Sequence, residues 1–368
     1  DSDGSNSDGS DSDAFSAAPG REDALCSILY TSGSSGAPRA VAHRWRQHRA
    51  AAAASQENLP LDEWDCWQCV IPLHHIGGLA ILTRALFYGC AVLLHDGFDV
   101  AEVTAALHGR DVTVSSLVPT MLHRMLEADE NLRGDDLPLL RAILLGGAGA
   151  AEALWLRIMD RNLPVVGTYG LTESCAQVAT ADPDRWRAEA WTAGRALPGV
   201  DLVLRDAEGR RCAAGGKAGE IHLRGAMIAE GYYHDSTATD AAFSKGWFAT
   251  GDIGALDNDG NLHVLARRVD MILSGGEKVF PSVVEELLLR HEGVIDAAVV
   301  GVEDEEWGQR VAAALVLRPG AKISDVEEFC REELAAHQLP RLWRVLDALP
   351  RTANGKILRG KLREMFRD

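Results

Sequence analysis

The chain has 368 residues and a formal net charge of −17, because 54 acidic side chains outnumber 37 basic ones. Nucleic-acid backbones require clustered Lys and Arg, so this balance argues against nucleic acid as a partner. No uninterrupted apolar run reaches the roughly eighteen residues of a membrane-spanning helix, and no secretory leader is recognisable. The length allows two domains, each with a core of its own.

The cysteine pattern indicates the compartment. Seven cysteines are spread along the chain, as is typical of a reduced, cytoplasmic protein rather than of a disulfide scaffold. Cys66 and Cys69 form one C-x-x-C, with His74 and His75 shortly after. A zinc site is the alternative interpretation, but there is no second cysteine pair and the surrounding residues are typical of a protein core.

The composition of the chain changes along its length. Residues 1–22 are acidic, of low complexity and nearly free of apolar side chains, which predicts a disordered tail. Beyond this tail, short apolar strands alternate with helical segments, as in an α/β domain. A compact α+β unit follows from about residue 271.

The apolar spacing predicts the following elements. In the α/β domain the strands are 25–30, 70–72, 91–94, 112–114, 142–145 and 165–166, and the helices are 79–88, 100–108, 119–128 and 151–161. Three later strands between Gly- and Asp-rich turns, 200–204, 219–223 and 261–265, predict a small β-barrel. The α+β unit is predicted to contain helices 281–291, 325–335 and 357–366 and strands 295–302 and 311–317.

A loop rich in hydroxyl groups follows the first strand, which is expected to be buried. The loop comprises Thr31, Ser32, Gly33, Ser34, Ser35 and Gly36. Glycines let a backbone turn sharply and approach a ligand, and successive N–H groups and hydroxyls form a concavity suited to phosphate oxygens. Arg39 adds a cation that would answer phosphate charge. The alternative is a polar surface loop; a Walker A loop is excluded because its Gly-Lys-Ser/Thr ending is absent.

Two further motifs follow predicted strands. Gly146 and Gly147 come after strand 142–145, at the kind of strand end where a flat ligand can lie on the backbone. The segment after strand 165–166 offers an aromatic face, a hydroxyl and a hard carboxylate suited to Mg²⁺; its residues are Tyr169, Gly170, Thr172 and Glu173.

The polar residues farther along the chain have both a structural and a functional interpretation. The Asp252 carboxylate would accept hydrogen bonds from a ribose diol. Arg267 and Asp270 would form a surface ion pair at a domain boundary or belong to a ligand site. Gly275 and Gly276 form a glycine-rich turn, and Lys356 lies in a turn that a generic basic helix start would also explain.

These motifs, in this order, are similar to those of the adenylate-forming superfamily, which contains acyl-CoA synthetases, luciferases and peptide-synthetase adenylation domains. The resemblance extends from residue 25 to the end, although the loop departs from the family pattern at Ser35, Arg39 and Ala40, and Ala266 replaces a glycine. It implies an enzyme that uses ATP, Mg²⁺ and coenzyme A. It also implies an AMP-binding domain over residues 23–266, a hinge over 267–270 and a mobile C-terminal domain over 271–368.

The resemblance implies a role for each motif residue. The hydroxyl-rich loop and Arg39 would grip the β- and γ-phosphates, and Glu173 would place Mg²⁺. Lys356, Thr172, Glu173 and His75 would be catalytic, with Lys356 offsetting the charge that grows on the α-phosphorus. The other nucleotide contacts would be Gly146, Gly147, Tyr169 stacked on adenine, Gly170, Asp252 and Arg267, while Gly275 and Gly276 would line the pantetheine tunnel.

A second resemblance concerns the acid. Segments 72–79, 84–89, 118–122 and 274–277 are similar to the o-succinylbenzoate–CoA ligases of menaquinone biosynthesis. His75 and Gly78 would then lie in the acyl pocket, and Arg84 would counter a second substrate carboxylate. The alternatives are a medium-chain or aryl acyl-CoA synthetase, and an adenylation domain that loads a carrier protein.

The start of the chain departs from the family pattern. Only 28 residues precede Leu29, whereas family members usually have well over a hundred residues before the phosphate loop. A missing N-terminal segment, a homo-oligomer and a non-catalytic nucleotide-binding remnant are therefore all left open.

Overall fold

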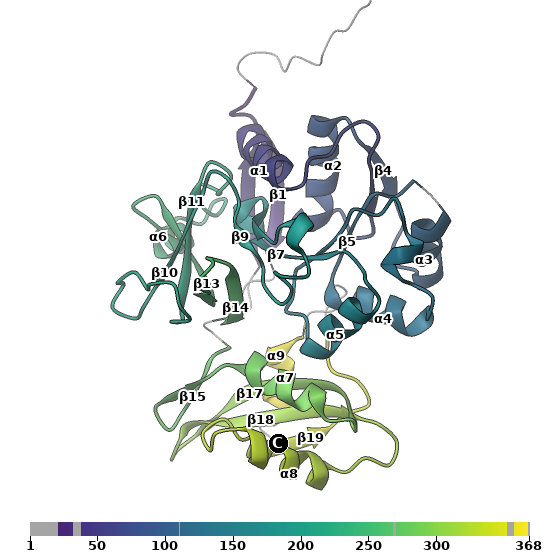
Figure 1. Ribbon diagram of the computed structural model, residues 1–368. Helices are drawn as coiled ribbons and strands as arrows, with labels where there is room; N and C mark the ends of the chain where they lie inside the picture. The colour runs from purple at the N-terminus through teal and green to yellow at the C-terminus, as the bar shows by residue number, and fades with distance from the viewer. Residues whose placement is uncertain (1–20, 32–37, 110, 268–269, 352–356, 367–368) are drawn as a thin grey trace, which may run out of the picture.

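The computed structural model describes residues 21–31, 38–109, 111–267, 270–351 and 357–366 (Figure 1). A seven-stranded sheet in the order β4-β3-β5-β6-β7-β8-β9 organises the large part of the chain. The pairs from β4 to β7 are parallel, and β8 and β9 continue the sheet antiparallel. The strands are β3 (Cys66–Cys69), β4 (Ala91–Leu94), β5 (Val114–Leu117), β6 (Ala142–Leu145), β7 (Val165–Leu171), β8 (Ala176–Thr180) and β9 (Arg195–Ala196).

Helices cover both faces of this sheet because its central strands are apolar on both sides. Along β6, Ala142 and Leu144 pack into one core with residues of α2, whereas Ile143 and Leu145 pack into another with residues of α3, α4 and α5. The helices are α1 (Trp45–Asn58), α2 (Ile76–Tyr88), α3 (Val100–Gly109), α4 (Pro119–Ala128) and α5 (Glu152–Asp160). None of the helices in the described part of the chain is long and apolar enough to cross a membrane.

A hairpin precedes this sheet. Strands β1 (Leu25–Thr31) and β2 (Arg39–Arg44) pair antiparallel, with Thr31 opposite Arg39. The first strand was expected to be buried, but only Leu29 is buried in it. The reason is that β1 pairs with β2 alone among the described strands.

The predicted small barrel is a five-stranded antiparallel sheet. Its order is β10-β11-β13-β12, with β14 paired to β13, and β10 does not pair with β14 to close it within the described residues. The elements are β10 (Val200–Arg205), β11 (Gly219–Gly225), α6 (Ser236–Ala242), β12 (Phe243–Ser244), β13 (Trp247–Leu256) and β14 (Leu262–Arg267).

The C-terminal unit lies below the large part in Figure 1 and has a sheet of its own in the order β16-β15-β18-β17, with β19 parallel to β18. Its elements are β15 (Ile272–Ser274), β16 (Glu277–Val279), α7 (Pro281–Arg290), β17 (Val294–Asp304), β18 (Gly308–Leu317), α8 (Ile323–Glu333), β19 (Leu342–Val345) and α9 (Arg359–Met365). Residues 268 and 269 of the predicted hinge lie outside the described part.

The expected α/β class is confirmed, and most predicted elements are present within a few residues. Two strands were misplaced: β3 ends at Cys69, before the predicted 70–72, and β5 begins at Val114, where the predicted strand ends. Helix α1 was missed, although its five consecutive alanines favour a helix. Glu22, assigned to the tail, is tied to α1, because Arg49 Nη2 lies 2.8 Å from its carboxylate.

Helix α1 and strand β2 contribute two buried histidines. His43 and His48 are each at most 1% exposed, with ring centroids 5.6 Å apart. His48 Nε2 lies 3.0 Å from Ser27 Oγ, and His48 Nδ1 lies 3.4 Å from Cys175 Sγ. Burial, together with a neighbouring group (His48 for His43 and Arg84 for His48), lowers the pKa of each imidazole to about 4.

These histidines should make the fold sensitive to mild acid. The unfolded chain binds their protons near pH 6.5 and the folded chain only near pH 4, so their stabilising effect is full above pH 6.5 and is lost as the pH falls toward 4. When the pH falls from 7 to 5.5, the unfolding free energy of the wild type should decrease. His43→Phe should make this decrease smaller by about 1 kcal/mol. Urea unfolding at the two pH values checks this, with His234→Phe, at an exposed histidine, as the control. Equal losses in wild type and His43→Phe would contradict it.

Candidate active site

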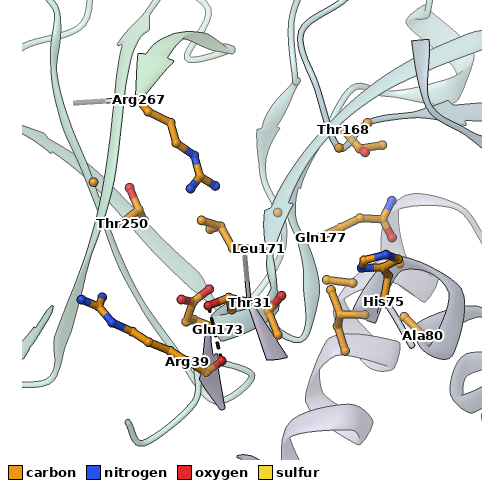
Figure 2. Close-up of a pocket in the computed structure, with 18 of the residues that line it drawn as sticks. Thr31, Arg39, His75, Ala80, Thr168, Leu171, Glu173, Gln177, Thr250 and Arg267 are labelled. Atoms are coloured by element: carbon orange, nitrogen blue, oxygen red, sulfur yellow. Dashed lines mark hydrogen bonds between the residues drawn. The ribbon is translucent and has the colours of Figure 1, made fainter. Parts of the chain in front are cut away.

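A cavity of about 1300 Å³ lies between the carboxyl ends of the parallel strands, the start of α2 and the five-stranded sheet. Its wall includes Thr31 and Arg39 from the hairpin, His75 from the start of α2, and Arg267 from the end of β14. Figure 2 shows Arg39, Thr31 and Glu173 together at one end, with His75 and Gln177 on the opposite side. Ligands of open α/β sheets bind at this edge of the sheet.

The hairpin carries the two ends of the predicted phosphate loop to Glu173. Ser32, Gly33, Ser34, Ser35 and Gly36 lie outside the described residues, but Thr31 and Arg39 flank them. Thr31 Oγ1 donates to the Arg39 carbonyl at 3.4 Å, and the Arg39 guanidinium lies 5.2 Å from the ring centre of Tyr232. The Tyr232 hydroxyl donates to Glu173 Oε1 at 2.8 Å. Thus a cation, a phenol and a carboxylate line one end of the cavity.

The carboxylate of Glu173 is mostly shielded from solvent. Glu173 is 8% exposed and sits in a short 3₁₀ turn (Thr172–Ser174) that follows β7. Burial raises the pKa of Tyr232, and the Glu173 carboxylate raises it further, so the phenol remains a donor. Thr172 and Gly170 line the cavity beside Glu173. A single carboxylate beside a phosphate site suits Mg²⁺, which is commonly held by one or two carboxylates together with substrate phosphates.

A chain of contacts joins β7 to the five-stranded sheet. The Tyr169 hydroxyl donates to Asp252 Oδ2 at 2.8 Å, and Arg267 Nε lies 3.3 Å from Asp252 Oδ1. Burial, with the adjacent Asp252 charge, raises the pKa of Tyr169 well above its ordinary value. Tyr169 and Asp252 stand behind the cavity wall, to which Arg267 and Thr250 belong. Stacking of Tyr169 on adenine therefore stays a prediction.

Gly146 and Gly147 line the cavity after β6, as expected from their place at a strand end. A side chain at Gly146 would begin 2.4 Å from Thr168 Oγ1 and 3.2 Å from the Thr168 carbonyl, so glycine lets the chain that leaves β6 pass close to β7. Gly147 has a φ of +79°, a conformation that favours glycine.

The residues predicted for the acid do not all reach the cavity. His75 and Arg84 line it, but Gly78 does not, and its neighbour Gly77 does. A side chain on Gly78 would begin 2.4 Å from the Ile71 carbonyl, so this glycine serves the close packing of α2 against residues 71–72.

Arg84 is a buried cation in the cavity wall. It is 2% exposed, and its Nη1 donates to Gln177 Oε1 and, at 3.4 Å, to Ser55 Oγ. Within the described residues, its Nε and Nη2 have no hydrogen-bond partner. Burial lowers the pKa of Arg84, against the opposing influence of Tyr88 and Cys175. A buried guanidinium whose described partners are neutral favours an anionic group close to it.

Two further predicted residues of the described part do not line the cavity. Gly275 and Gly276 form the turn between β15 and β16, where Gly275 packs against the Trp307 ring, and neither lines the cavity. Lys356 lies outside the described residues. Conversely, the cavity wall includes Gln177 and Tyr232, which the sequence does not reveal because neither belongs to a recognisable motif and the partner of each is distant along the chain.

Comparisons with known proteins agree with this geometry. The family model of the AMP-binding enzymes matches residues 1–233, and that of the AMP-binding enzyme C-terminal domain matches residues 283–356. The 2-succinylbenzoate–CoA ligase of Bacillus licheniformis is 39% identical over 340 residues, which cover 92% of this chain and 70% of the relative.

A solved relative, the o-succinylbenzoate CoA synthetase (MenE) of Bacillus subtilis, is 37% identical and matches 93% of this chain. In complex with the acyl-adenylate intermediate OSB-AMP it aligns with a TM-score of 0.86, covering 69% of that chain. With ATP and magnesium ion the TM-score is 0.85, covering 70%. For a double mutant bound to the product analogue OSB-NCoA the TM-score is 0.64, covering 70% of that chain. From its family-model matches, its relatives and its fold, this chain belongs to the AMP-binding enzyme family.

Proposed function

We propose that this chain is an ATP-dependent acid–thiol ligase that converts o-succinylbenzoate to o-succinylbenzoyl-CoA through an acyl-adenylate. The names of its relatives support this substrate. The observation that carries the proposal within the chain itself is Arg84, a buried guanidinium in the cavity wall whose Nε and Nη2 lack partners in the described part of the chain.

The charge of Arg84 explains why the substrate would have two carboxylates. One carboxylate must reach the nucleotide to be adenylated, and a second would offset the charge of the Arg84 guanidinium. o-Succinylbenzoate has both, separated by an aromatic ring. The wall between offers apolar surface for that ring, from Trp67, Ile71, Ile81, Leu117, Val118, Met121 and Leu144.

The other end of the cavity would bind ATP. Arg39 and Thr31 would contact the β- and γ-phosphates, and Arg267, which Asp252 holds from behind, would contact the nucleoside. Glu173, with Thr172, would hold Mg²⁺, which would neutralise phosphate charge when bound. Tyr232 would keep Glu173 in place through its hydrogen bond to Oε1.

The reaction would proceed in two steps. The acid carboxylate attacks the α-phosphorus of ATP, pyrophosphate leaves and acyl-AMP forms; Lys356 would stabilise the charge on the phosphorus. The CoA thiol then attacks the acyl carbon and AMP leaves. The small domain would rotate about residues 267–270 between the steps, bringing Gly275 and Gly276 to the pantetheine tunnel.

A second candidate function follows from the apolar part of the wall. Those side chains would also accept a medium-chain or aryl acid, and in that case Arg84 would have only a structural role. Adenylation for a carrier protein and a remnant without catalysis are further alternatives.

The acid and the activity are tested together by pyrophosphate release with a panel of carboxylates. We expect release to depend on an added acid and to be fastest with o-succinylbenzoate, and Lys356→Ala should abolish it because the phosphorus loses its cation. A faster rate with a fatty acid would favour the second candidate, and transfer to a holo-carrier but not to CoA would favour carrier loading. No release from wild type would indicate a remnant.

Replacing Arg84 with Gln should raise the KM for o-succinylbenzoate by about 10- to 100-fold, since a hydrogen bond to a charged group contributes about 1.5–3 kcal/mol. The KM for ATP should stay within about twofold. The control is the analogue without the ring carboxylate, whose KM should not change on substitution. Equal losses for both acids, measured by steady-state kinetics, would contradict a role for Arg84 in binding the second carboxylate.

We propose also that further polypeptide covers the outer side of the hairpin. Leu25 and Ile28 of β1 are 50% and 38% exposed. The relatives are longer, since the match spans 70% of the Bacillus licheniformis ligase. A further N-terminal segment or a second copy of this chain would bury these side chains.

This surface predicts self-association of the chain when it is produced alone. Ile28→Lys should shift it toward monomer, because a charge would be placed in the contact; light scattering after gel filtration measures this. Ile295→Lys, at an exposed apolar residue of the C-terminal unit (47% exposed), is the matched control. Monomers in all three proteins would contradict association through β1.

We propose a cytoplasmic location for the protein. All seven cysteines are free thiols, which supports a reducing compartment. Burial raises the pKa of Cys90, Cys175 and Cys330, to about 11, 12 and 11 respectively, so these thiols stay protonated and unreactive.

A further inference from the structure

We propose that Asp296 and Glu285 are positioning residues for the adenylation step. They would act by fixing the chain on both sides of residues 352–356, the segment that contains Lys356. The inference rests on the proposed function, because it takes Lys356 to be the cation of that step.

The N-terminal side of the segment is fixed by Asp296. Arg351 Nη2 donates to both carboxylate oxygens of Asp296, each at 2.8 Å. Both side chains are partly shielded, at 27% and 29% exposure. The two ends of the segment also meet: Arg351 and Ile357 form an antiparallel bridge, and the Leu358 amide donates to the Pro350 carbonyl at 2.8 Å.

The C-terminal side of the segment is fixed by Glu285. Arg359 Nη1 and Nη2 donate to the two oxygens of Glu285 at 2.5 and 3.0 Å, and Nη1 also donates to the Val299 carbonyl at 2.6 Å. The Val299 amide in turn donates to Glu285 Oε1 at 2.7 Å. This closed arrangement locks α7, β17 and α9 together. Bidentate pairs of this kind fix geometry as well as charge.

Both anchors therefore depend on one strand. Asp296 lies on β17, and so does Val299, three residues farther on. The pair of Arg359 and Glu285 is well shielded, at 19% and 13% exposure. Burial alone would lower the pKa of Arg359, but the Glu285 and Asp270 carboxylates together outweigh it and the pKa is raised. The guanidinium is thus a permanent cation at this position.

Helix α9 also contacts Asp270 of the predicted hinge. Arg363 Nη2 donates to Asp270 Oδ1 at 2.9 Å, and Arg359 Nε lies 3.6 Å from Asp270 Oδ2. The segment with Lys356 is thereby linked to both β17 and residue 270. Its ends should move with the C-terminal unit and not independently of it.

The anchored side of the C-terminal unit faces the large part of the chain. Helix α7 contacts α5, and Arg290 Nη2 lies 2.5 Å from Glu152 Oε2 between them. Figure 1 shows α7 and α9 on the side of the unit that is turned toward α5. The arrangement aligns better with the Bacillus subtilis enzyme bound to OSB-AMP (TM-score 0.86) than with its complex with OSB-NCoA (0.64).

Measuring the two half-reactions separately distinguishes a positioning role of Asp296 and Glu285 from a role in folding. Only adenylation requires Lys356, whereas thioester formation from supplied acyl-adenylate requires the same folded unit in another orientation. Asp296→Asn should lower kcat for adenylation by at least about tenfold, and Glu285→Gln by up to about 100-fold, since misplacing a catalytic group by about 1 Å can cost about 100-fold. The KM for ATP and the rate of thioester formation should stay within about twofold. Asp296→Glu, which keeps the carboxylate, should restore much of the adenylation rate.

A matched control and a readout independent of activity complete the experiment. Glu327→Gln removes the carboxylate of another ion pair in this unit, with Arg331 at 2.9 Å on α8, and should leave both half-reactions unchanged. Hydrogen exchange of the Leu358 amide should be faster in both test variants than in wild type, whatever the reaction proves to be. Equal losses in both half-reactions, or no change in rate and exchange, would overturn the proposal. An inactive wild type would contradict the proposed function, and Leu358 exchange would then decide the inference alone.

Discussion

The cavity depends on one constraint, the buried positive charge of Arg84. No carboxylate of the described residues forms an ion pair with it. Arg84 is almost fully shielded, yet within the described residues its neighbours are neutral groups, Gln177 and Ser55. Leaving a charge in such surroundings costs free energy that a bound anion would offset. The charge of Arg84 would therefore favour a ligand with a negative group near this part of the wall. A chain with a net charge of −17 needs such local cations to bind an anionic substrate.

The rest of the cavity follows from how the strands end. Glycine at 146 lets the chain that leaves β6 pass close to Thr168 of β7, and the segment after β7 places Glu173 against Tyr232. The same strand β7 is joined to the five-stranded sheet through Tyr169, Asp252 and Arg267. The two sheets are thus tied together directly behind the wall that a nucleotide would contact. This tie fixes the width of the cavity at the nucleotide end.

The sequence predicted features that depend on the type and order of residues along the chain. It did not predict those that depend on which distant residues contact each other. The alternation of strands and helices predicted the α/β class, and motif order predicted that Thr31, Arg39, Glu173 and Arg267 would meet. Tyr169 was expected in the cavity, but it lies in β7 with its hydroxyl on Asp252. Asp252 itself lies within β13, next to Gly251, whose φ of +74° favours glycine. The pairing of Arg84 with Gln177 joins residues 93 positions apart, which local patterns do not reveal.

The ion pairs of the C-terminal unit determine which kind of motion can move Lys356. If the segment that contains Lys356 swung by itself, its ends would have to break the contacts of Arg351 with Asp296 and of Arg359 with Glu285. The second pair is shielded and bidentate, and such pairs are costly to separate because each partner would remain as a buried charge. The contact between Arg290 and Glu152 is different: it joins the two parts of the chain and is 49% and 29% exposed. Exposed pairs contribute only about 0–1 kcal/mol, so rotation of the whole unit breaks the weaker contact and keeps the stronger ones. The distribution of charges therefore favours rotation of the unit about residue 270 over movement of the segment alone.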